Sequence, residues 1–402
     1  MAIALPSDTR NLLRSVELFT GAGGLAIATH HSGFRHRGLF EWNENACATL
    51  KENAANAVIR GIKSSWNIRE GDVSQASFAK FEGIDLVAGG PPCQPFSIGG
   101  KHRGMEDKRD MIPHFIRAVR EAKPRAFIME NVKGLTRQAF QNYLSYTELQ
   151  LTYPTVTRKR KESWSDHLSR LERTHTGKSR PEIRYNIVRR VLNSANFGVA
   201  QTRERIFIVG FRSDVTSQWN FPEPTHSLDR LLFDQWITGE YWDRHQIRRP
   251  EQQPSRFYGR IRKLANWMPI DERPWVTLRD KIADLPEPTI GLEMGDSFNH
   301  RIQPGARSYK GHTGSPLDLP SKTLKAGDHG VPGGENMIAF EDGSVRYLTV
   351  REAARVQSFP DEWRFEGAWS EVMRQLGNAV PVDLARVVAS SVAKSLREHD
   401  RG

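Results

Sequence analysis

Cysteine is scarce in this 402-residue chain: Cys47 and Cys93 are the only two, too few for a disulfide framework. No Cys/His cluster has the spacing of a zinc site, so we expect no structural metal. Apolar runs such as residues 126–129 and 206–211 are far shorter than the roughly 20 residues of a membrane-spanning helix. The N-terminus also lacks the apolar stretch and cleavage site of a signal peptide. These absences predict a cytoplasmic protein without membrane contact.

Composition and charge narrow the class of protein. Hydrophobic residues make up 38% and charged residues 26% of the chain, which is typical of a globular protein and excludes collagen, coiled coil and wholesale disorder. The length predicts two or three domains. Lys and Arg number 58 against 47 acidic residues, and the net charge of +11 favours a polyanionic partner, most simply nucleic acid. Charge alone does not decide this, because many basic enzymes never bind DNA.

Strand-like and helix-like segments alternate along the first half of the chain, as they do in α/β proteins. The predicted strands are residues 15–19, 38–41, 84–88, 126–129, 185–191 and 206–211. The predicted helices are residues 24–32, 45–56, 111–122, 349–358 and 380–397. Residues 138–181 and 222–274 show no clear periodicity, and residues 291–334 are dense in turn-forming residues, which predicts loops and short strands.

Glycines follow the first predicted strand in the turn Phe19-x-Gly21-x-Gly23-Gly24, which opens a helix. Glycine lets the backbone approach a ligand closely and leaves amide N–H groups at the helix start free to bind it. Many glycine-rich turns are only turns, so the motif alone is weak. Its GxGG form favours S-adenosylmethionine over NAD, since it must seat a methionine tail rather than a pyrophosphate.

Three further residues strengthen the cofactor interpretation. Glu41 ends the second predicted strand, where a doubly wound nucleotide-binding fold places an acid for ribose hydroxyls. Trp42 would stack on an adenine, and Asp72 would accept a hydrogen bond from its amino group. Taken singly, each is better explained as a solvated acid or a packing tryptophan. Taken as an ordered set, they favour a nucleoside cofactor.

Cys93 and Glu130 emerge from one predicted βαβ unit. Cys93 follows the strand 84–88 on a proline-rich turn, Glu130 follows the strand 126–129, and the helix 111–122 joins the two strands. Carboxyl ends of neighbouring parallel strands meet at one edge of a sheet, so both side chains should lie at the ligand-binding edge. A cysteine on a rigid turn beside a carboxylic acid is a nucleophile with a proton donor.

Each of these residues has an ordinary structural alternative. A free cysteine is usually a buried small hydrophobe; we assign that role to Cys47, whereas the prolines around Cys93 favour a loop that positions a side chain. Glu130 alone would be a strand-end carboxylate that caps a turn. Arg203 and Arg205 share one face of an extended chain. They form either a solvated charged edge or a guanidinium site for the carbonyl oxygen of a planar substrate.

With these residues assembled, the sequence resembles the DNA cytosine-5 methyltransferases of bacterial restriction–modification systems. The motifs that carry the resemblance stand in the family's usual order: Phe19 to Gly24, Pro91-Pro92-Cys93-Gln94, Glu130-Asn131-Val132, Gln201-x-Arg203-x-Arg205, residues 346–359 and Gln375-Leu376-Gly377-Asn378-Ala379-Val380. The thiol motif is Pro-Cys-Gln, not the Cys-Phe-Thr variant of the tRNA-methylating relatives, which favours DNA over RNA.

The resemblance implies methyl transfer from S-adenosylmethionine to C5 of a cytosine flipped out of double-stranded DNA. Cys93 would add to C6 while protonated Glu130 activates N3. Arg205 would hold the O2 oxygen, and Arg203 would support the nucleophile loop. A cognate restriction endonuclease acting on the same site is a candidate partner, and the expected location is the bacterial cytoplasm, in association with the nucleoid.

The resemblance also assigns binding residues. Those expected to hold S-adenosylmethionine are Phe19, Gly21, Gly23, Glu41, Trp42, Asp72, Pro92, Ile112 and Asn378. Those expected to contact DNA are Gln94, Ser97, Lys101, Arg109 and Thr323. Residues 97–109 resemble the mobile loop that closes over the flipped base, and glycines within it suit a hinge.

The expected fold is α/β: a Rossmann-like, mainly parallel sheet of the S-adenosylmethionine-dependent methyltransferase type, with a second, smaller and irregular target-recognition domain. Residues 1–285 and 374–402 would form the catalytic and cofactor-binding domain, with a basic insertion at 138–181 and a variable insertion at 230–275. Residues 286–373 would form the recognition domain. The variable insertion interleaves basic and aromatic residues, and is either a nucleic-acid contact or an ordinary surface insertion.

Rival functions stay open. An RNA cytosine-5 methyltransferase would act on tRNA rather than duplex DNA. A catalytically silent DNA-binding module on the same fold is disfavoured by intact Cys93, Glu130 and Arg205. A dinucleotide-dependent oxidoreductase would need a hydride acceptor site and gives Cys93 beside Glu130 no role.

Overall fold

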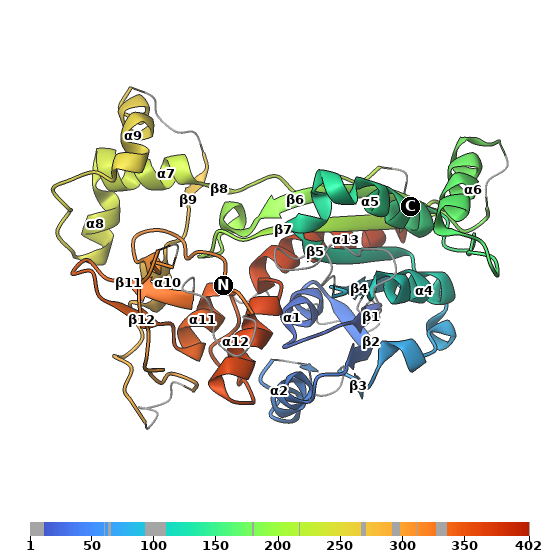
Figure 1. Ribbon diagram of the computed structural model, residues 1–402, viewed down its shortest axis with the longest axis horizontal. Coiled ribbons are helices and arrows are strands. Elements are labelled where there is room, and N and C mark those ends of the chain that lie inside the picture. The colour runs from blue at the N-terminus through green and yellow to red at the C-terminus, as the bar shows by residue number, and fades with distance from the viewer. Residues whose placement is uncertain are drawn as a thin grey trace.

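The fold is described from a computed structural model of the chain (Figure 1). The described residues are 12–59, 61–62, 66–92, 110–178, 181–216, 218–266, 271–291, 298–310, 312–326 and 336–401. Five of the residues singled out from the sequence lie outside them: Cys93, Gln94, Ser97, Lys101 and Arg109.

A seven-stranded sheet positions the expected site. Its strands are β1 (Leu13–Leu18), β2 (Phe34–Glu41), β3 (Ile68–Glu70), β4 (Leu86–Gly89), β5 (Ala126–Val132), β6 (Tyr185–Asn193) and β7 (Glu204–Arg212). They lie in the order β3-β2-β1-β4-β5-β7-β6, and every pairing from β3 to β5 is parallel. Only β7 runs antiparallel to both of its neighbours. The mainly parallel α/β sheet predicted from the sequence is confirmed, and its topological switch point lies between β1 and β4.

Helices cover both faces of this sheet (Figure 1). On one face, α1 (Gly24–His31), α2 (Glu44–Ala55) and α13 (Val382–His399) share a core with alternate residues of the strands. On the other face, α4 (Ile112–Ala122) and α5 (Gln141–Thr152) do the same. Buried residues recur along α4 and α13 at helical spacing, which is why their sequences predicted helices. Cys47 is buried in α2, where burial raises its pKa to about 12.

Both insertions contain helices that the sequence pattern did not predict. Residues 138–181 include α5 and α6 (Trp164–Thr176), which share a small aromatic cluster. Within residues 222–274 lie α7 (Leu228–Phe233), a π-helical turn (Asp234–Thr238), α8 (Glu240–His245) and α9 (Tyr258–Leu264). Helices of six or seven residues are too short to show a clear period, so the pattern gave no signal. Figure 1 shows α6 and α7–α9 at opposite ends of the molecule.

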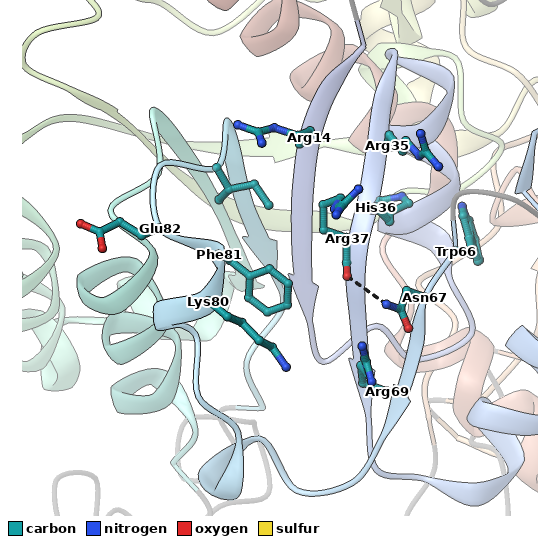
Figure 2. Close-up of a pocket in the computed structure, with 11 residues that line it drawn as sticks. Arg14, Arg35, His36, Arg37, Trp66, Asn67, Arg69, Lys80, Phe81 and Glu82 are labelled. Atoms are coloured by element: carbon teal, nitrogen blue, oxygen red, sulfur yellow. Dashed lines mark hydrogen bonds between the residues drawn. The ribbon is translucent and has the colours of Figure 1, made fainter. Parts of the chain in front are cut away.

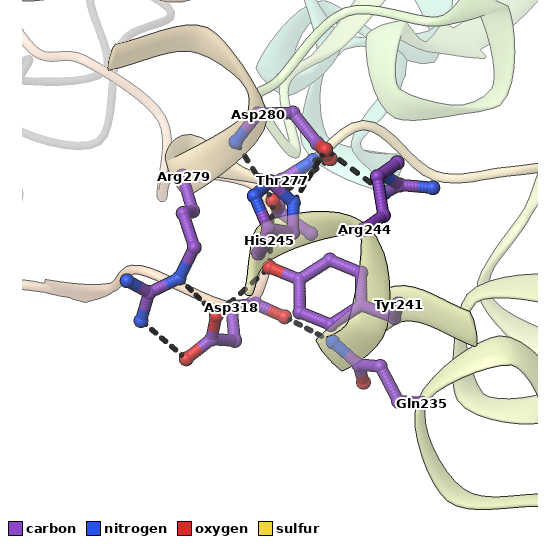
Figure 3. Close-up of polar contacts among 8 residues, drawn as sticks. All are labelled: Gln235, Tyr241, Arg244, His245, Thr277, Arg279, Asp280 and Asp318. Atoms are coloured by element: carbon purple, nitrogen blue, oxygen red, sulfur yellow. Dashed lines mark hydrogen bonds and ion pairs between the residues drawn. The ribbon is translucent and has the colours of Figure 1, made fainter. Parts of the chain in front are cut away.

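The smaller part of the molecule is built from short elements. These are β8 (His226–Ser227), β9 (Arg273–Pro274), α10 (Leu278–Ile282), β10 (Ser315–Pro316), β11 (Met337–Ala339) and β12 (Val345–Tyr347). Asp318 ties the variable insertion to this part: it accepts hydrogen bonds from Tyr241 of α8 at 2.8 Å and from Arg279 of α10 at 2.6 Å (Figure 3). Asp318, which lies in the expected recognition domain, thus contacts both the variable insertion and α10, and the division of the chain into two domains stays a prediction.

Two helices near the expected end of the recognition domain contribute to the core of the large sheet. These are α11 (Val350–Val356) and α12 (Trp369–Asn378), and the boundary at residue 373 stays a prediction. The apolar residues of both helices share one buried cluster with residues of α1 and α13.

Gly377 tests this close packing of α12. A Cβ atom at Gly377 would lie 2.3 Å from the backbone nitrogen of Ala326, which cannot rotate away. We therefore expect Gly377→Ala to lower the free energy of unfolding by about 1–3 kcal/mol, the usual cost of overpacking, in urea denaturation. Gly259→Ala in α9 is the matched control, since its Cβ would meet open space. Equal stability of Gly377→Ala and the parent would contradict the packing described.

Candidate active site

Glu130 and Arg205 meet because β7 runs antiparallel to β5. The strand β5 continues to Val132, so Glu130 lies within the strand and not just after it, as the sequence had suggested. In this pairing Glu130 faces Phe207 and Val132 faces Arg205. Glu130 and Arg205 are thus diagonal neighbours on one face of the sheet. The Nε atom of Arg205 lies 2.9 Å from Oε1 of Glu130, and both side chains are largely buried.

The surroundings of Glu130 favour its protonated form. Burial raises the pKa of this carboxyl group, while the positive charges of Arg205 and Arg203 offset part of that rise. A Cβ atom at Gly90 would lie 2.9 Å from Oε2 of Glu130, so a glycine at this position leaves space for the second carboxyl oxygen. A carboxyl group with a raised pKa at the ligand-binding edge of an α/β sheet is a candidate proton donor.

Asn131 anchors the turn that leads to Cys93. Its Nδ2 atom donates a hydrogen bond to the carbonyl oxygen of Pro91 at 3.0 Å, and the backbone N–H of Met111 donates to the carbonyl of Pro92 at 3.3 Å. The chain entering the cysteine turn is thereby tied to β5. No role for Asn131 was predicted from the sequence; its place directly after Glu130 was the available signal. Pro92 itself is exposed.

Arg203 connects the start of β7 to two distant segments of the chain, one at Leu324 and one at Gly377 and Ala379. Its fully buried guanidinium donates hydrogen bonds to the carbonyl oxygens of Leu324 at 2.9 Å, Gly377 at 2.6 Å and Ala379 at 3.0 Å. Burial holds the pKa of Arg203 well below its usual range, and nearby Arg205 adds to the effect. These contacts tie the start of β7 to the C-terminal helices. Its expected support of the cysteine loop stays a prediction, because that loop lies outside the described residues.

Thr323 and Gln201 complete this junction. The Thr323 hydroxyl donates to the carbonyl of Thr202 at 2.7 Å, and the Gln201 side chain accepts from the N–H of Leu324 at 3.0 Å. The segment around Thr323 is therefore fastened beside the start of β7. Its predicted contact with DNA stays a prediction.

Glu41 organises the glycine turn after β1. Its Oε2 accepts a hydrogen bond from the N–H of Gly21 at 2.7 Å, and its Oε1 accepts from those of Trp42 and Asn43 at 2.9 and 2.8 Å. A carboxylate offers about four acceptor positions, so one remains on Oε2. Phe19 has a φ of 58°, which is uncommon for a bulky residue and is strain of the kind found at ligand-binding turns.

The remaining cofactor candidates differ in their settings. Trp42 follows β2 with 73% of its side chain exposed, and Asn378 is exposed at the end of α12. Asp72 is exposed too, but its carboxylate accepts hydrogen bonds from the N–H and hydroxyl of Ser74, which lower its pKa. Ile112 is completely buried in the core at the start of α4. Their contacts with a cofactor stay predictions.

No helix in the part of the chain that the structure describes is long and apolar enough to cross a membrane.

Comparisons with family models and with individual proteins agree on one family. A family model described as C-5 cytosine-specific DNA methylase matches residues 13–151 and 174–394. The chain is similar to Type II methyltransferase M.Eco47II of Escherichia coli, with 32% identity over 97% of this chain and 82% of that protein. It is also similar to Type II methyltransferase M.NgoMIV of Neisseria gonorrhoeae, with 29% identity over 96% and 99% of the two chains.

Solved structures share the fold at low sequence identity. The S. pombe Dnmt2 methyltransferase aligns over 96% of this chain and 99% of its own, with a TM-score of 0.52 and 17% identity. The Entamoeba histolytica methyltransferase EhMeth aligns over the same shares, with a TM-score of 0.55 and 13% identity.

The pairing of Glu130 with Arg205 predicts a pH-dependent stability. A carboxyl group whose pKa is raised by folding destabilises the protein as the pH rises through that pKa. In Arg205→Ala the carboxylate loses its ion-pair partner, so we expect a loss of about 3–5 kcal/mol at pH 8. The loss should be smaller at pH 5, because the raised pKa of Glu130 eases its protonation as the pH falls. Urea denaturation at both pH values measures this.

The double variant Arg205→Ala/Glu130→Gln is the control for this prediction. It removes the titrating group, so its stability deficit relative to Glu130→Gln should be the same at pH 5 and pH 8. If the deficit of Arg205→Ala alone were also independent of pH, Glu130 would not be the buried acid that Arg205 stabilises.

Proposed function

Because the chain belongs to the C-5 cytosine-specific DNA methylase family, of the bacterial restriction–modification type, we propose that it methylates C5 of cytosine within a specific sequence of double-stranded DNA, using S-adenosylmethionine. The observation that carries the proposal is the buried Glu130–Arg205 pair at the edge where β4 leads toward Cys93. An acid with a raised pKa beside a guanidinium suits a ring that presents a basic nitrogen and a carbonyl oxygen.

The chemistry follows from the weak nucleophilicity of C5 in cytosine. The Cys93 thiolate forms a bond to C6, and the electron pair displaced from the C5–C6 double bond makes C5 nucleophilic. Glu130 gives its proton to N3, and Arg205 holds the O2 oxygen, so the charge that develops on the ring is neutralised. Once C5 carries the methyl group, a base removes the C5 proton, and the C6–S bond breaks with its electron pair leaving on the Cys93 sulfur. The C5–C6 double bond is thereby restored, and N3 returns its proton to Glu130.

The edge beside β1 and β2 fits S-adenosylmethionine, which supplies an electrophilic methyl group when bound. One acceptor position of Glu41 is free for a ribose hydroxyl, and the exposed ring of Trp42 offers a stacking surface. The positive φ angles of Gly21 and Gly23 open the turn to a close approach. The residues that would hold the cofactor are Phe19, Gly21, Gly23, Glu41, Trp42, Asp72, Pro92, Ile112 and Asn378.

Duplex DNA hides the reacting atoms, so the target cytosine has to leave the stack before Cys93 reaches C6. The names of the Type II relatives support DNA as the substrate over tRNA. A restriction endonuclease that cuts the same site, and a cytoplasmic location close to the nucleoid, complete the proposal.

Covalent trapping tests this mechanism. Duplex DNA that carries 5-fluorocytosine at the target has no C5 proton to lose, so the enzyme should remain bonded to it after methyl transfer. Denaturing electrophoresis of the complex, followed by peptide mass spectrometry, should place the adduct on Cys93. Glu130→Gln should form the adduct more slowly by a factor of about 10²–10⁴, the usual contribution of a positioned acid.

Cys93→Ser and Cys47→Ser are the matched variants for this experiment. Cys93→Ser should form no adduct while it still binds S-adenosylmethionine, and Cys47→Ser should be trapped like the parent because Cys47 is buried in α2. An adduct that persists in Cys93→Ser would overturn the assignment of the nucleophile.

A further inference from the structure

A basic pocket lies at the edge of the large sheet opposite the candidate active site (Figure 2). Its volume is about 600 Å³, and Arg14, Arg35, Arg37, Arg69, Lys80 and Glu82 are among the residues that line it. Arg35 stands at the start of β2, whereas Glu41 ends the same strand. Six residues of strand separate them, roughly 20 Å at about 3.3 Å per residue. The other end of the lining lies closer to the cofactor edge, because Arg69 of β3 pairs with Phe40, the residue before Glu41.

The charges in this pocket are poorly balanced. Five of the lining side chains are cationic and one, Glu82, is acidic, and Glu82 is already paired with Lys123 at 2.6 Å. Arg14 lies 3.8 Å from Asp85, but that carboxylate is held more closely by Arg125 at 3.0 Å. Within the part of the chain that is described, no acidic side chain forms an ion pair with Arg37, Arg69 or Lys80. Several cations facing one hollow attract an anion of high charge.

A β-bulge adds Arg37 to the pocket. Ser15 of β1 pairs with His36 and the next residue, Val16, pairs with Gly38, so Arg37 is the extra residue of β2. Bulges bend a strand and redirect a side chain, and they recur beside functional sites. A Cβ atom at Gly38 would lie 3.0 Å from the ring of Phe40 and 3.3 Å from that of Phe81, so glycine is needed where the bulge ends.

His36 contributes no positive charge to the pocket. Its ring is buried between hydrogen bonds to Ser15 at 2.9 Å and to the carbonyl oxygen of Ala26 at 3.0 Å. Burial lowers the pKa of His36 to about 3, so the ring is neutral. The pocket thus combines a neutral, fixed wall with guanidinium and ammonium groups that reach into the solvent.

We propose that this pocket binds the phosphate groups of an oligophosphate. Guanidinium groups match phosphate oxygens with paired N–H donors, and Lys80 adds a point charge. The phosphates come from a small oligophosphate or from a second stretch of nucleic acid.

Calorimetric titration of the full chain with inorganic triphosphate tests the proposal. We expect one triphosphate to bind per chain. The double variant Arg37→Ala/Arg69→Ala should weaken triphosphate binding by about tenfold or more, because charge-assisted hydrogen bonds to the phosphates are lost. Arg190→Ala/Lys394→Ala removes the same charge from exposed positions elsewhere and should change the affinity less than about twofold.

A second titration identifies the source of the phosphates. Hexathymidylate, which contains no cytosine, should displace triphosphate if nucleic acid is the ligand, and should leave it bound if a small oligophosphate is. Methylation by Arg37→Ala alone should proceed at the parent rate, because Arg37 is not among the residues assigned to the active site. The proposal is overturned if triphosphate does not bind, if it binds the double variant as tightly as the parent, or if Arg37→Ala loses methylation.

Discussion

The antiparallel pairing of β7 with β5 is the constraint on which the active site depends. It brings the start of β7 to the edge where the parallel strands end, and its register sets Arg205 diagonally against Glu130. A slip of one residue would turn Arg205 to the other face and leave a buried carboxyl group without a partner. Buried ion pairs are seldom retained for stability alone, because removing two charges from water costs about as much as their attraction returns. The Glu130–Arg205 pair is better explained by a chemical role, because Arg205 influences the acidity of Glu130.

The same strand start holds the two halves of the molecule together. Arg203 reaches the loop before residue 326 and the end of α12, so the C-terminal segments return to the sheet beside the active site. A Cβ atom at Gly24 would lie 2.4 Å from the carbonyl oxygen of Val380, which shows how closely the segment between α12 and α13 approaches the glycine turn. The segment from Gly377 to Val380 therefore contacts both the start of β7 and the glycine turn.

Much of this arrangement was predictable because it is local. The strands β1, β2, β4 and β5 follow from the sequence pattern, as do α1, α2 and α4, and Glu130 was located from its place after an apolar segment. The direction of β7 was not predictable, since alternation of apolar residues is the same for parallel and antiparallel strands. The partners of Arg203 lie more than 120 residues away, at distances that no sequence period encodes. The bulge at Arg37 depends on strand register, which is likewise a tertiary property.

Bisulfite sequencing measures the central claim most directly. Plasmid DNA from cells that express the chain, in a host without cytosine-5 methylation of its own, should contain one short sequence in which the same cytosine resists conversion in every copy. DNA from a parallel culture that expresses Cys93→Ser should convert completely. Complete conversion of the DNA exposed to the parent chain, with the folded protein present in the cells, would contradict the assignment of cytosine-5 methylation to this active site.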